Sequence, residues 1–307
     1  MLEKTIRIGT RDSELALWQA HTVQKKLNDL GYATQIIAVK STGDLILDKP
    51  LYELGITGIF TKTLDIAMLK EEVDIAVHSM KDVPTILPNG IVQGAVLERA
   101  STLDILVHKG NLDFLKTNGI IASGSLRRKA QWLDKYPSHK VEDLRGNVNT
   151  RMQKLHDNNW NGAIFAAAGL DRINLKPSDY IDLDWMTPAP AQGAMLVVAM
   201  EKDNFILEAL KNLNHKETEI CTYIERQFLR TLEGGCTAPI GALAIKKRNQ
   251  IDFKGVLFSL DGKEKFTIEK SCNFDAYINF GQYCANEILK NGGKSLMEKL
   301  RIALKVK

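Results

Sequence analysis

The sequence has few cysteines, and their arrangement suggests neither a disulfide framework nor a metal site. Cys221, Cys236, Cys272 and Cys284 are the four cysteines among 307 residues, with no C-x-x-C pair and no zinc-type spacing to histidine. No two of the six histidines stand four residues apart, as two ligands on one helix face would. We therefore expect reduced thiols and no bound metal.

Long apolar runs are also missing. The first residues, 1–6, show no signal-peptide pattern, and no segment approaches the roughly 20 apolar residues that cross a bilayer. We expect a cytoplasmic protein with no membrane partner. A formal net charge of +4 is too small to indicate nucleic-acid binding by itself. The chain also lacks the basic stripe with interleaved aromatics that such binding favours.

What remains is an ordinary globular composition, with 44% hydrophobic and 25% charged residues and room for two or three domains. Predicted strands cover residues 5–9, 34–39, 73–77, 105–107, 119–122, 141–144, 163–168 and 193–199. Predicted helices cover residues 13–30, 59–69 and 148–156, with another beginning at residue 126, and a long polar loop covers residues 41–58. This alternation is typical of parallel α/β sheets and predicts two similar α/β lobes.

The first helix and the last third of the chain allow two further predictions. The expected buried face of the helix over residues 13–30 consists of Leu15, Trp18, Thr22, Leu27 and Leu30. After residue 240 the pattern changes to antiparallel strands over residues 243–245, 251–258 and 265–270, followed by helices over 275–289 and 295–304. We therefore expect a small α+β domain at the C-terminus.

Cationic and hydroxyl side chains follow five of the predicted strands. In doubly wound sheets, ligands bind beyond the carboxyl ends of the strands. The residues at these positions are Arg11, Ser13, Ser79, Lys81, Ser123, Ser125, Arg127, Arg128, Arg145, Arg151 and Arg172. Arginine forks bind carboxylate or phosphate through two hydrogen bonds, and helix N-termini also favour anions. Any one arginine is more commonly a solvated surface charge, but together they predict a small ligand with many negative groups.

One carboxylate, Asp82, stands among these cations next to Lys81. Pro84 should force Val83 into an extended conformation, so that no helix forms directly at Asp82 and its side chain projects from the strand end. Asp82 could cap a helix or pair with an arginine. Alternatively, it could stabilise a cationic intermediate or transfer a proton to a leaving group.

Cys236 follows a predicted helix over residues 217–233, which Gly234 should end. Its thiol is then expected on a tight, glycine-rich loop without bulky neighbours, which suits a covalent attachment point. The alternative is a small apolar residue packed under a turn, which is the usual fate of a free cysteine.

Eight motifs, all between residues 5 and 245, carry a resemblance to one family. They are residues 7–13 (RIGTRDS), 15–19 (LALWQ), 74–84 (DIAVHSMKDVP), 125–128 (SLRR), 144–148 (LRGNV), 167–170 (AAGL), 192–194 (QGA) and 232–236 (LEGGC). These resemble the hydroxymethylbilane synthases, also called porphobilinogen deaminases. The last sixty residues resemble the family only in pattern.

The resemblance implies two lobes like those of periplasmic binding proteins, with mixed, mostly parallel sheets, and a small α+β domain. The expected domains are residues 1–98 with 195–215, residues 99–194, and residues 216–307. It implies a dipyrromethane cofactor joined by a thioether to Cys236. Four porphobilinogen molecules would be deaminated and added head to tail, and the linear tetrapyrrole hydroxymethylbilane released. A cytoplasmic monomer without nucleic-acid partners is expected.

The resemblance also implies roles for single residues. Asp82 would steady the cation left when ammonia departs, and the basic and hydroxyl residues at the strand ends would bind acetate and propionate groups. Gln19, Phe60 and Gln192 would line the cleft. The chain departs from the family at Thr57, where lysine is common, and at Ser123-Gly124. A competing hypothesis is an anion-binding protein without catalysis, which would have no use for Cys236.

Overall fold

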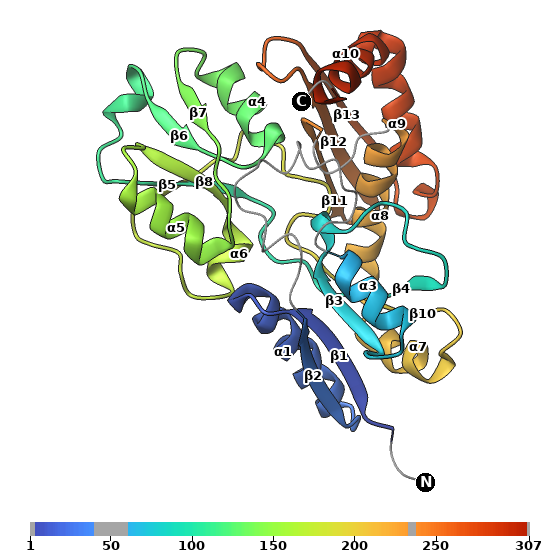
Figure 1. The fold of residues 1–307 in the computed structure, drawn as a ribbon. Coiled ribbons are helices and arrows are strands. Elements are labelled where there is room, and N and C mark those ends of the chain that lie inside the picture. The colour runs from blue at the N-terminus through green and yellow to red at the C-terminus, as the bar shows by residue number, and fades with distance from the viewer. Residues whose placement is uncertain (1–3, 40–60, 233–237, 306–307) are drawn as a thin grey trace. The chain divides into compact units, whose positions relative to one another are not determined.

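The computed structural model describes residues 4–39, 61–232 and 238–305, which divide into two compact units (Figure 1). Unit 1 comprises residues 4–39, 61–100 and 193–219, and unit 2 comprises the other described residues. The predicted division into three domains stays a prediction. Cys236, Phe60, Thr57 and most of the predicted loop at 41–58 lie outside the described residues.

Unit 1 is built on a five-stranded sheet with the order β2-β1-β3-β10-β4. Its strands are β1 (Ile6–Arg11), β2 (Thr34–Val39), β3 (Ile75–Ser79), β4 (Ile91–Val96) and β10 (Met195–Met200). Strand β1 runs parallel to β2 and β3, whereas β10 is antiparallel to both of its neighbours. The sheet packs against α1 (Glu14–Asp29), α3 (Lys62–Leu69) and α7 (Asn204–Lys211).

Unit 2 contains a second five-stranded sheet with the order β7-β6-β8-β5-β9. Its strands are β5 (Asp104–His108), β6 (Ile120–Ala122), β7 (Lys140–Glu142), β8 (Gly162–Ala166) and β9 (Tyr180–Asp182), and its helices are α4 (Leu126–Lys135), α5 (Val148–Asp157) and α6 (Ala167–Asp171). Strand β6 is parallel to β7 and β8, and β5 is antiparallel to β8 and β9.

The two sheets share one arrangement, because each has a single antiparallel strand at the fourth position of its strand order, β10 in unit 1 and β5 in unit 2. Strand β5 begins soon after the chain leaves unit 1, and β10 begins soon after it returns. An antiparallel strand starts where its parallel neighbours end. Asp104, the first residue of β5, is therefore opposite Ala166 at the end of β8, and Met195 is opposite Ser79 at the end of β3.

The rest of unit 2 is a three-stranded antiparallel sheet covered by helices. It contains α8 (Lys216–Thr231), which begins in unit 1, then β11 (Ile240–Lys247), β12 (Gln250–Phe258), β13 (Lys265–Asn273), α9 (Phe280–Ile288) and α10 (Lys294–Lys305). Edge-to-face contacts join Phe253 to Phe228 and to Phe280. These rings anchor α8 and α9 on the sheet. The predicted fold class of two α/β lobes and a C-terminal α+β part is confirmed.

The predicted buried face of α1 is largely wrong. The buried residues are Ala16, Gln19, Ala20, Val23 and Leu27, whereas Trp18 is 37% exposed and Leu30 is 48% exposed. Small residues bring the helix close to the sheet, so the large apolar side chains do not mark the contact.

Several element bounds also differ from the sequence prediction. The strand expected over residues 163–168 ends at Ala166, and the next residues form α6. Strands β4 and β9 and helix α7 were not predicted. Strand β9 has three residues and carries no distinct alternation, so its pairing with β5 is a tertiary effect.

Candidate functional site

In unit 1, the carboxyl ends of β1 and β3 lie at the same edge of the sheet, since the two strands are parallel neighbours. The Thr10 hydroxyl donates to the Ala16 carbonyl (2.9 Å) and so fixes the turn from β1 into α1. Arg11 ends β1, and Ser13 is the N-cap of α1 without a side-chain cap bond. The buried Gln19 amide donates to the Ser79 hydroxyl at 2.9 Å. The structure thus brings these predicted residues to one sheet edge.

Asp82 follows β3 at that edge. The expectation that no helix forms there is wrong in detail, because Met80–Asp82 make one turn of 3-10 helix before Val83 becomes extended (φ −89°, ψ 130°). The Met80 N–H donates to the Ala194 carbonyl (3.0 Å), which holds this turn beside the start of β10. Lys81 and Asp82 are both half-buried. Within the described part of unit 1, the Asp82 carboxylate makes no hydrogen bond or ion pair.

His78 lies four residues before Asp82, inside β3, and is only 6% exposed. Its Nε2 atom is buried and has no hydrogen-bond partner among the described residues. Burial, with a smaller contribution from the positive charge of Arg11, lowers the pKa of His78 to about 4. The imidazole is therefore neutral at pH 7 and adds no further positive charge to this edge.

In unit 2, the ends of β6, β7 and β8 share one edge because β6 is parallel to both neighbours. The Ser125 N–H donates to the Ser123 hydroxyl (3.3 Å), and the Ser125 hydroxyl caps α4 by accepting from the Arg128 N–H (3.5 Å). Ser123 is 2% exposed. This serine turn therefore sets the direction in which the first turn of α4 leaves the sheet.

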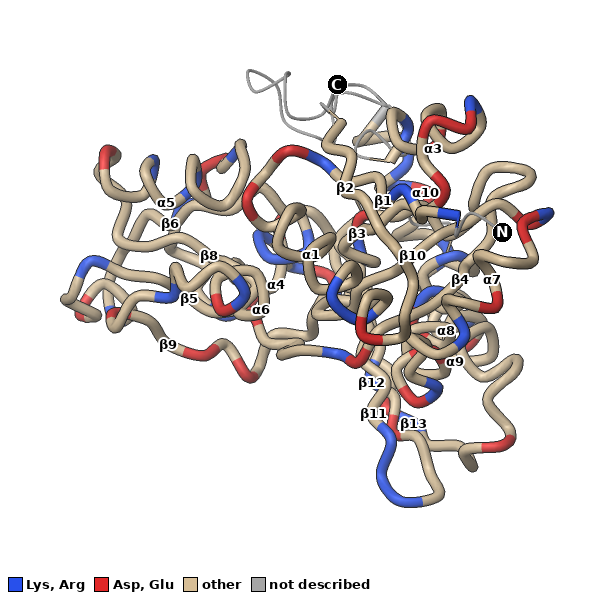
Figure 2. The backbone as a smooth tube through the Cα atoms, turned by 90° about the horizontal axis from the view of Figure 1, so that it is seen from below, with Lys and Arg blue, Asp and Glu red and all other residues tan. Residues whose placement is uncertain are grey.

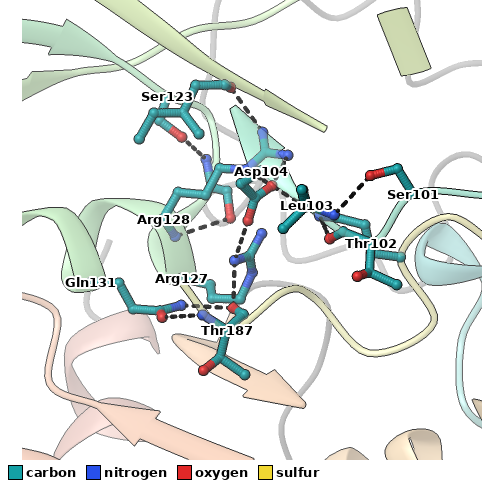
Figure 3. A network of polar contacts seen from close by, with 12 residues as sticks. Ser101, Thr102, Leu103, Asp104, Ser123, Arg127, Arg128, Gln131 and Thr187 are labelled. Atoms are coloured by element: carbon teal, nitrogen blue, oxygen red, sulfur yellow. Dashed lines mark hydrogen bonds and ion pairs between the residues drawn. The ribbon is translucent and has the colours of Figure 1, made fainter. Parts of the chain in front are cut away.

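Arg127 and Arg128 converge on the carboxylate of Asp104 (Figure 3). Arg127 Nη1 is 2.7 Å from Asp104 Oδ2, and Arg128 Nε and Nη2 are 2.9 and 2.8 Å from Oδ1. The three residues are 4%, 5% and 0% exposed. Burial alone would raise the pKa of Asp104, but the two arginines lower it well below its ordinary value. Burial also lowers the pKa of Arg127, against the attraction of Asp104.

Gln192, predicted to line a cleft, occupies an interior position. It is 0% exposed, and its Nε2 donates to the Thr102 carbonyl (2.8 Å) and to Asp104 Oδ1 (3.0 Å). Nearby, Gln131 exchanges two hydrogen bonds with the Thr187 backbone, and the Thr187 carbonyl also accepts from Arg127 (Figure 3). These contacts link α4 and the start of β5 to residues 187–192, which are distant from both in the sequence.

Of the remaining predicted arginines of unit 2, Arg145 follows β7, Arg151 lies in the N-terminal part of α5, and Arg172 follows α6. Arg145 is 7% exposed, and burial lowers its pKa although Asp143 opposes the effect. Arg172 follows α6, and burial lowers its pKa to about 10. Arg151 donates from Nε to the Gly146 carbonyl at 2.8 Å. A cation whose pKa burial has lowered is stabilised when an anion binds next to it, so Arg145 and Arg172 favour an anionic ligand.

Among the buried carboxylates, sequence reasoning missed Asp104 and Glu225. Asp104 directly precedes the apolar residues of β5, and this position of an acid before a buried strand was the available signal. Glu225 is 0% exposed and accepts from the backbone N–H groups of Ala191 (2.7 Å) and Ala244 (2.8 Å). It lies on the apolar side of α8, where the sequence pattern gave no indication of it.

Three further observations concern charge, metal binding and membrane-spanning helices. Figure 2 shows Lys and Arg interspersed with Asp and Glu along both units. Residues 4–39, 61–232 and 238–305 contain no group of three or more His, Cys, Asp or Glu side chains that could hold a metal ion. Over the same ranges, no helix is both long and apolar enough to cross a bilayer.

Among solved structures, the chain is similar to the methionine-binding protein MetQ, with 15% identity and a TM-score of 0.42 over 68% of this chain and 89% of that one. A periplasmic substrate-binding protein of an ABC transporter from Coxiella burnetii gives 16% identity and a TM-score of 0.43, over 68% and 91%.

Sequence comparison gives much closer relatives. A porphobilinogen deaminase of Desulforamulus reducens is 40% identical over 98% of this chain and 99% of its own length. A chloroplastic porphobilinogen deaminase of Oryza sativa subsp. japonica is 40% identical over 96% and 86%. A probable porphobilinogen deaminase of Methanocaldococcus jannaschii is 42% identical over 88% and 94%.

Family models match both parts of the chain. Residues 6–208 match the model described as "Porphobilinogen deaminase, dipyromethane cofactor binding domain", and residues 219–290 match "Porphobilinogen deaminase, C-terminal domain". The first match alone covers more than half of the chain and contains Asp82 and every cationic residue discussed above. The chain belongs to the porphobilinogen deaminase family.

Proposed function

We propose that this protein is a transferase that deaminates four porphobilinogen molecules and joins them head to tail, releasing the linear tetrapyrrole hydroxymethylbilane. The observation that carries the proposal is the gathering of cationic and hydroxyl side chains at the carboxyl edges of both sheets, together with Asp82, whose carboxylate has no ion pair within the described residues of unit 1. Each pyrrole unit carries an acetate and a propionate, so the growing chain is a polyanion. Membership of the family supports this assignment.

The residues present fit a dipyrromethane cofactor. The buried Arg145 and the half-buried Arg172 have lowered pKa values, because partial removal from water disfavours their charged forms, and a carboxylate would offset that cost. Arg127, Arg128 and Arg151 would complete the carboxylate-binding set of unit 2, with Ser123 and Ser125. When bound, the dipyrromethane supplies the pyrrole carbon to which substrate units are added. We assign its covalent attachment to Cys236.

Asp82 is the proposed catalytic residue. Its carboxylate makes no ion pair within the described part of unit 1, so its negative charge is available to a ligand. Loss of ammonia from porphobilinogen leaves a positive charge on the substrate pyrrole. Asp82 would stabilise that charge, accept a hydrogen bond from the pyrrole N–H and assist proton transfer. Arg11, Ser13, Ser79 and Lys81 would hold the substrate carboxylates beside it.

The position of the proposed reaction in the cell follows from the same chemistry. The substrate and product are small, charged and water-soluble, and the described helices offer no membrane span. We propose a cytoplasmic monomer without nucleic-acid partners. Size-exclusion chromatography with light scattering tests the proposal of a monomer. The measured molar mass should be that of a single chain in the presence and in the absence of porphobilinogen.

The first experiment is intact-mass spectrometry of the freshly purified protein. A mass above that of the bare chain by two linked pyrrole units is expected, and Cys236→Ser should lack the addition. Cys221→Ser is the matched control, because it removes a buried thiol of α8 and should keep the adduct. An unmodified mass together with a freely reactive Cys236 would favour a binding protein without catalysis.

The second experiment is the rate of porphobilinogen consumption by Asp82→Asn. The amide keeps the shape of the side chain but not its charge, so turnover should fall by about 100- to 1000-fold while the far-ultraviolet spectrum stays unchanged. Asp12→Asn, an exposed acid near the end of β1, serves as the control and should retain its activity. Turnover of Asp82→Asn close to that of the unmodified sequence would contradict the proposed role.

A further inference from the structure

Asp104 lies at the carboxyl edge of its sheet, and its carboxylate is fully buried. It is the first residue of β5, and the antiparallel pairing of β5 with β8 places it opposite Ala166, where β8 ends. It therefore lies at the carboxyl edge of the sheet, the edge from which Ser123 and Ser125 lead into α4. Ligands of α/β sheets bind along this edge.

The charges around Asp104 do not balance. Arg127 and Arg128 contribute two positive charges, and the carboxylate between them contributes one negative charge, which leaves a net charge of +1 in a group that is 5% exposed or less. The Nε atom of Arg127 is buried and has no partner in the described part of the chain. An uncompensated buried charge is costly, so the cluster is set up to accept one more anion.

The contacts also fix the geometry of both guanidinium groups. Asp104 uses Oδ2 for Arg127 and Oδ1 for Arg128, while backbone carbonyls of Thr187 and Ile164 accept further bonds from the same two side chains. Asp104 is itself held by Gln192, whose amide also binds the Thr102 carbonyl. Each long arginine side chain thus has one arrangement, and little conformational entropy remains to be lost when a ligand binds.

We propose that Asp104 is a positioning residue that orients Arg127 and Arg128 for binding a carboxylate of the pyrrole ligand. This inference rests on the proposed function. A buried ion pair contributes little to stability compared with apolar residues of similar volume, so stability alone gives no reason for a buried Arg-Asp-Arg cluster. Asp104 acts through the two arginines and does not itself touch the reacting atoms.

The test compares Asp104→Asn with the unmodified sequence in two measurements. The first is the fraction of purified protein that carries the pyrrole adduct, from intact mass, and it should fall several-fold. The second is steady-state kinetics with porphobilinogen. Because the carboxylates are remote from the bond that breaks, we expect KM to rise by about tenfold while kcat of the loaded fraction changes by less than about threefold.

Leu300→Ala is the control for general destabilisation. Leu300 lies on α10, is 3% exposed and belongs to the hydrophobic core of the C-terminal part. That core cluster does not include Asp104, Arg127 or Arg128. At a temperature where both variants are fully folded, Leu300→Ala should keep the adduct fraction and KM of the unmodified sequence. The same changes in both variants, or none in Asp104→Asn, would refute the positioning role.

Asp104→Glu keeps the inference testable where the asparagine variant fails to fold. It preserves the negative charge but moves it by one methylene group, so the arginines shift and the adduct fraction and KM should change in the same direction. Normal values in Asp104→Glu would show that charge alone suffices and that orientation does not matter. If the protein without any substitution carried no adduct and consumed no porphobilinogen, that result would instead contradict the proposed function.

Discussion

Acidification should destabilise unit 1 through His78. The pKa of His78 is lowered from 6.5 to about 4, because its ring is buried and, to a smaller extent, because Arg11 is near. The unfolded chain therefore binds a proton more readily than the folded one. Stability from the neutral ring is fully present above pH 6.5 and is lost as pH falls from 6.5 towards 4. The complete loss is about 3 kcal/mol, of which about 2 kcal/mol has occurred at pH 5.

The measurement is urea unfolding, followed by circular dichroism, at pH 7.5 and pH 5.0. His78→Leu replaces the ring with an apolar side chain that cannot take up a proton. The difference in unfolding free energy between the two pH values should therefore be smaller in His78→Leu than in the unmodified sequence, by about 2 kcal/mol. His21→Gln removes an exposed histidine of α1 and should leave the difference unchanged. An equal pH dependence in His78→Leu and the unmodified sequence would refute the reasoning.

Two further predictions concern buried carboxylates, and urea unfolding at pH 7.5 checks both. Asp74 accepts three hydrogen bonds from Arg7, at 2.8, 3.0 and 2.8 Å. Asp74→Ala should therefore destabilise unit 1 by about 2–3 kcal/mol. An unchanged urea concentration at the midpoint of unfolding would be evidence against a stabilising role of this pairing. Glu225 binds two backbone N–H groups through different oxygens, and glutamine has one acceptor oxygen. Glu225→Gln should therefore cost about 1–3 kcal/mol, whereas Glu217→Gln at the start of α8 should cost much less.

The strand-end residues could be predicted from sequence because of a simple geometric rule. Arg11 and Ser79 are the last residues of two neighbouring parallel strands, and parallel strands end at the same edge. The alternation of strands and helices was enough to predict that arrangement. It could not tell which strands were antiparallel, since an apolar run such as residues 105–107 reads the same in either direction.

That ambiguity explains why Asp104 was missed. In a parallel strand, the first residue lies at the edge away from the ligand, and Asp104 would have been remote from Arg127. The antiparallel direction of β5 reverses this and places the two side chains 2.7 Å apart. The buried face of α1 was predicted wrongly for a different reason. The buried Gln19 amide donates a hydrogen bond to the Ser79 hydroxyl, and the spacing of apolar residues does not indicate a buried polar side chain.

Asp82 and Asp104 are both aspartates at the carboxyl edge of a five-stranded sheet, and the two sheets share one strand arrangement. Their neighbouring side chains differ, so we expect different roles for the two carboxylates. The Asp104 carboxylate is paired with two guanidinium groups. Its substitution should therefore weaken substrate binding and appear mainly in KM. Asp82 makes no ion pair within the described residues of unit 1, and we propose that its charge acts on the substrate, so its substitution should appear mainly in kcat. If Asp82→Asn raised KM alone and Asp104→Asn lowered kcat alone, the local partners of a carboxylate would not determine its role in this protein.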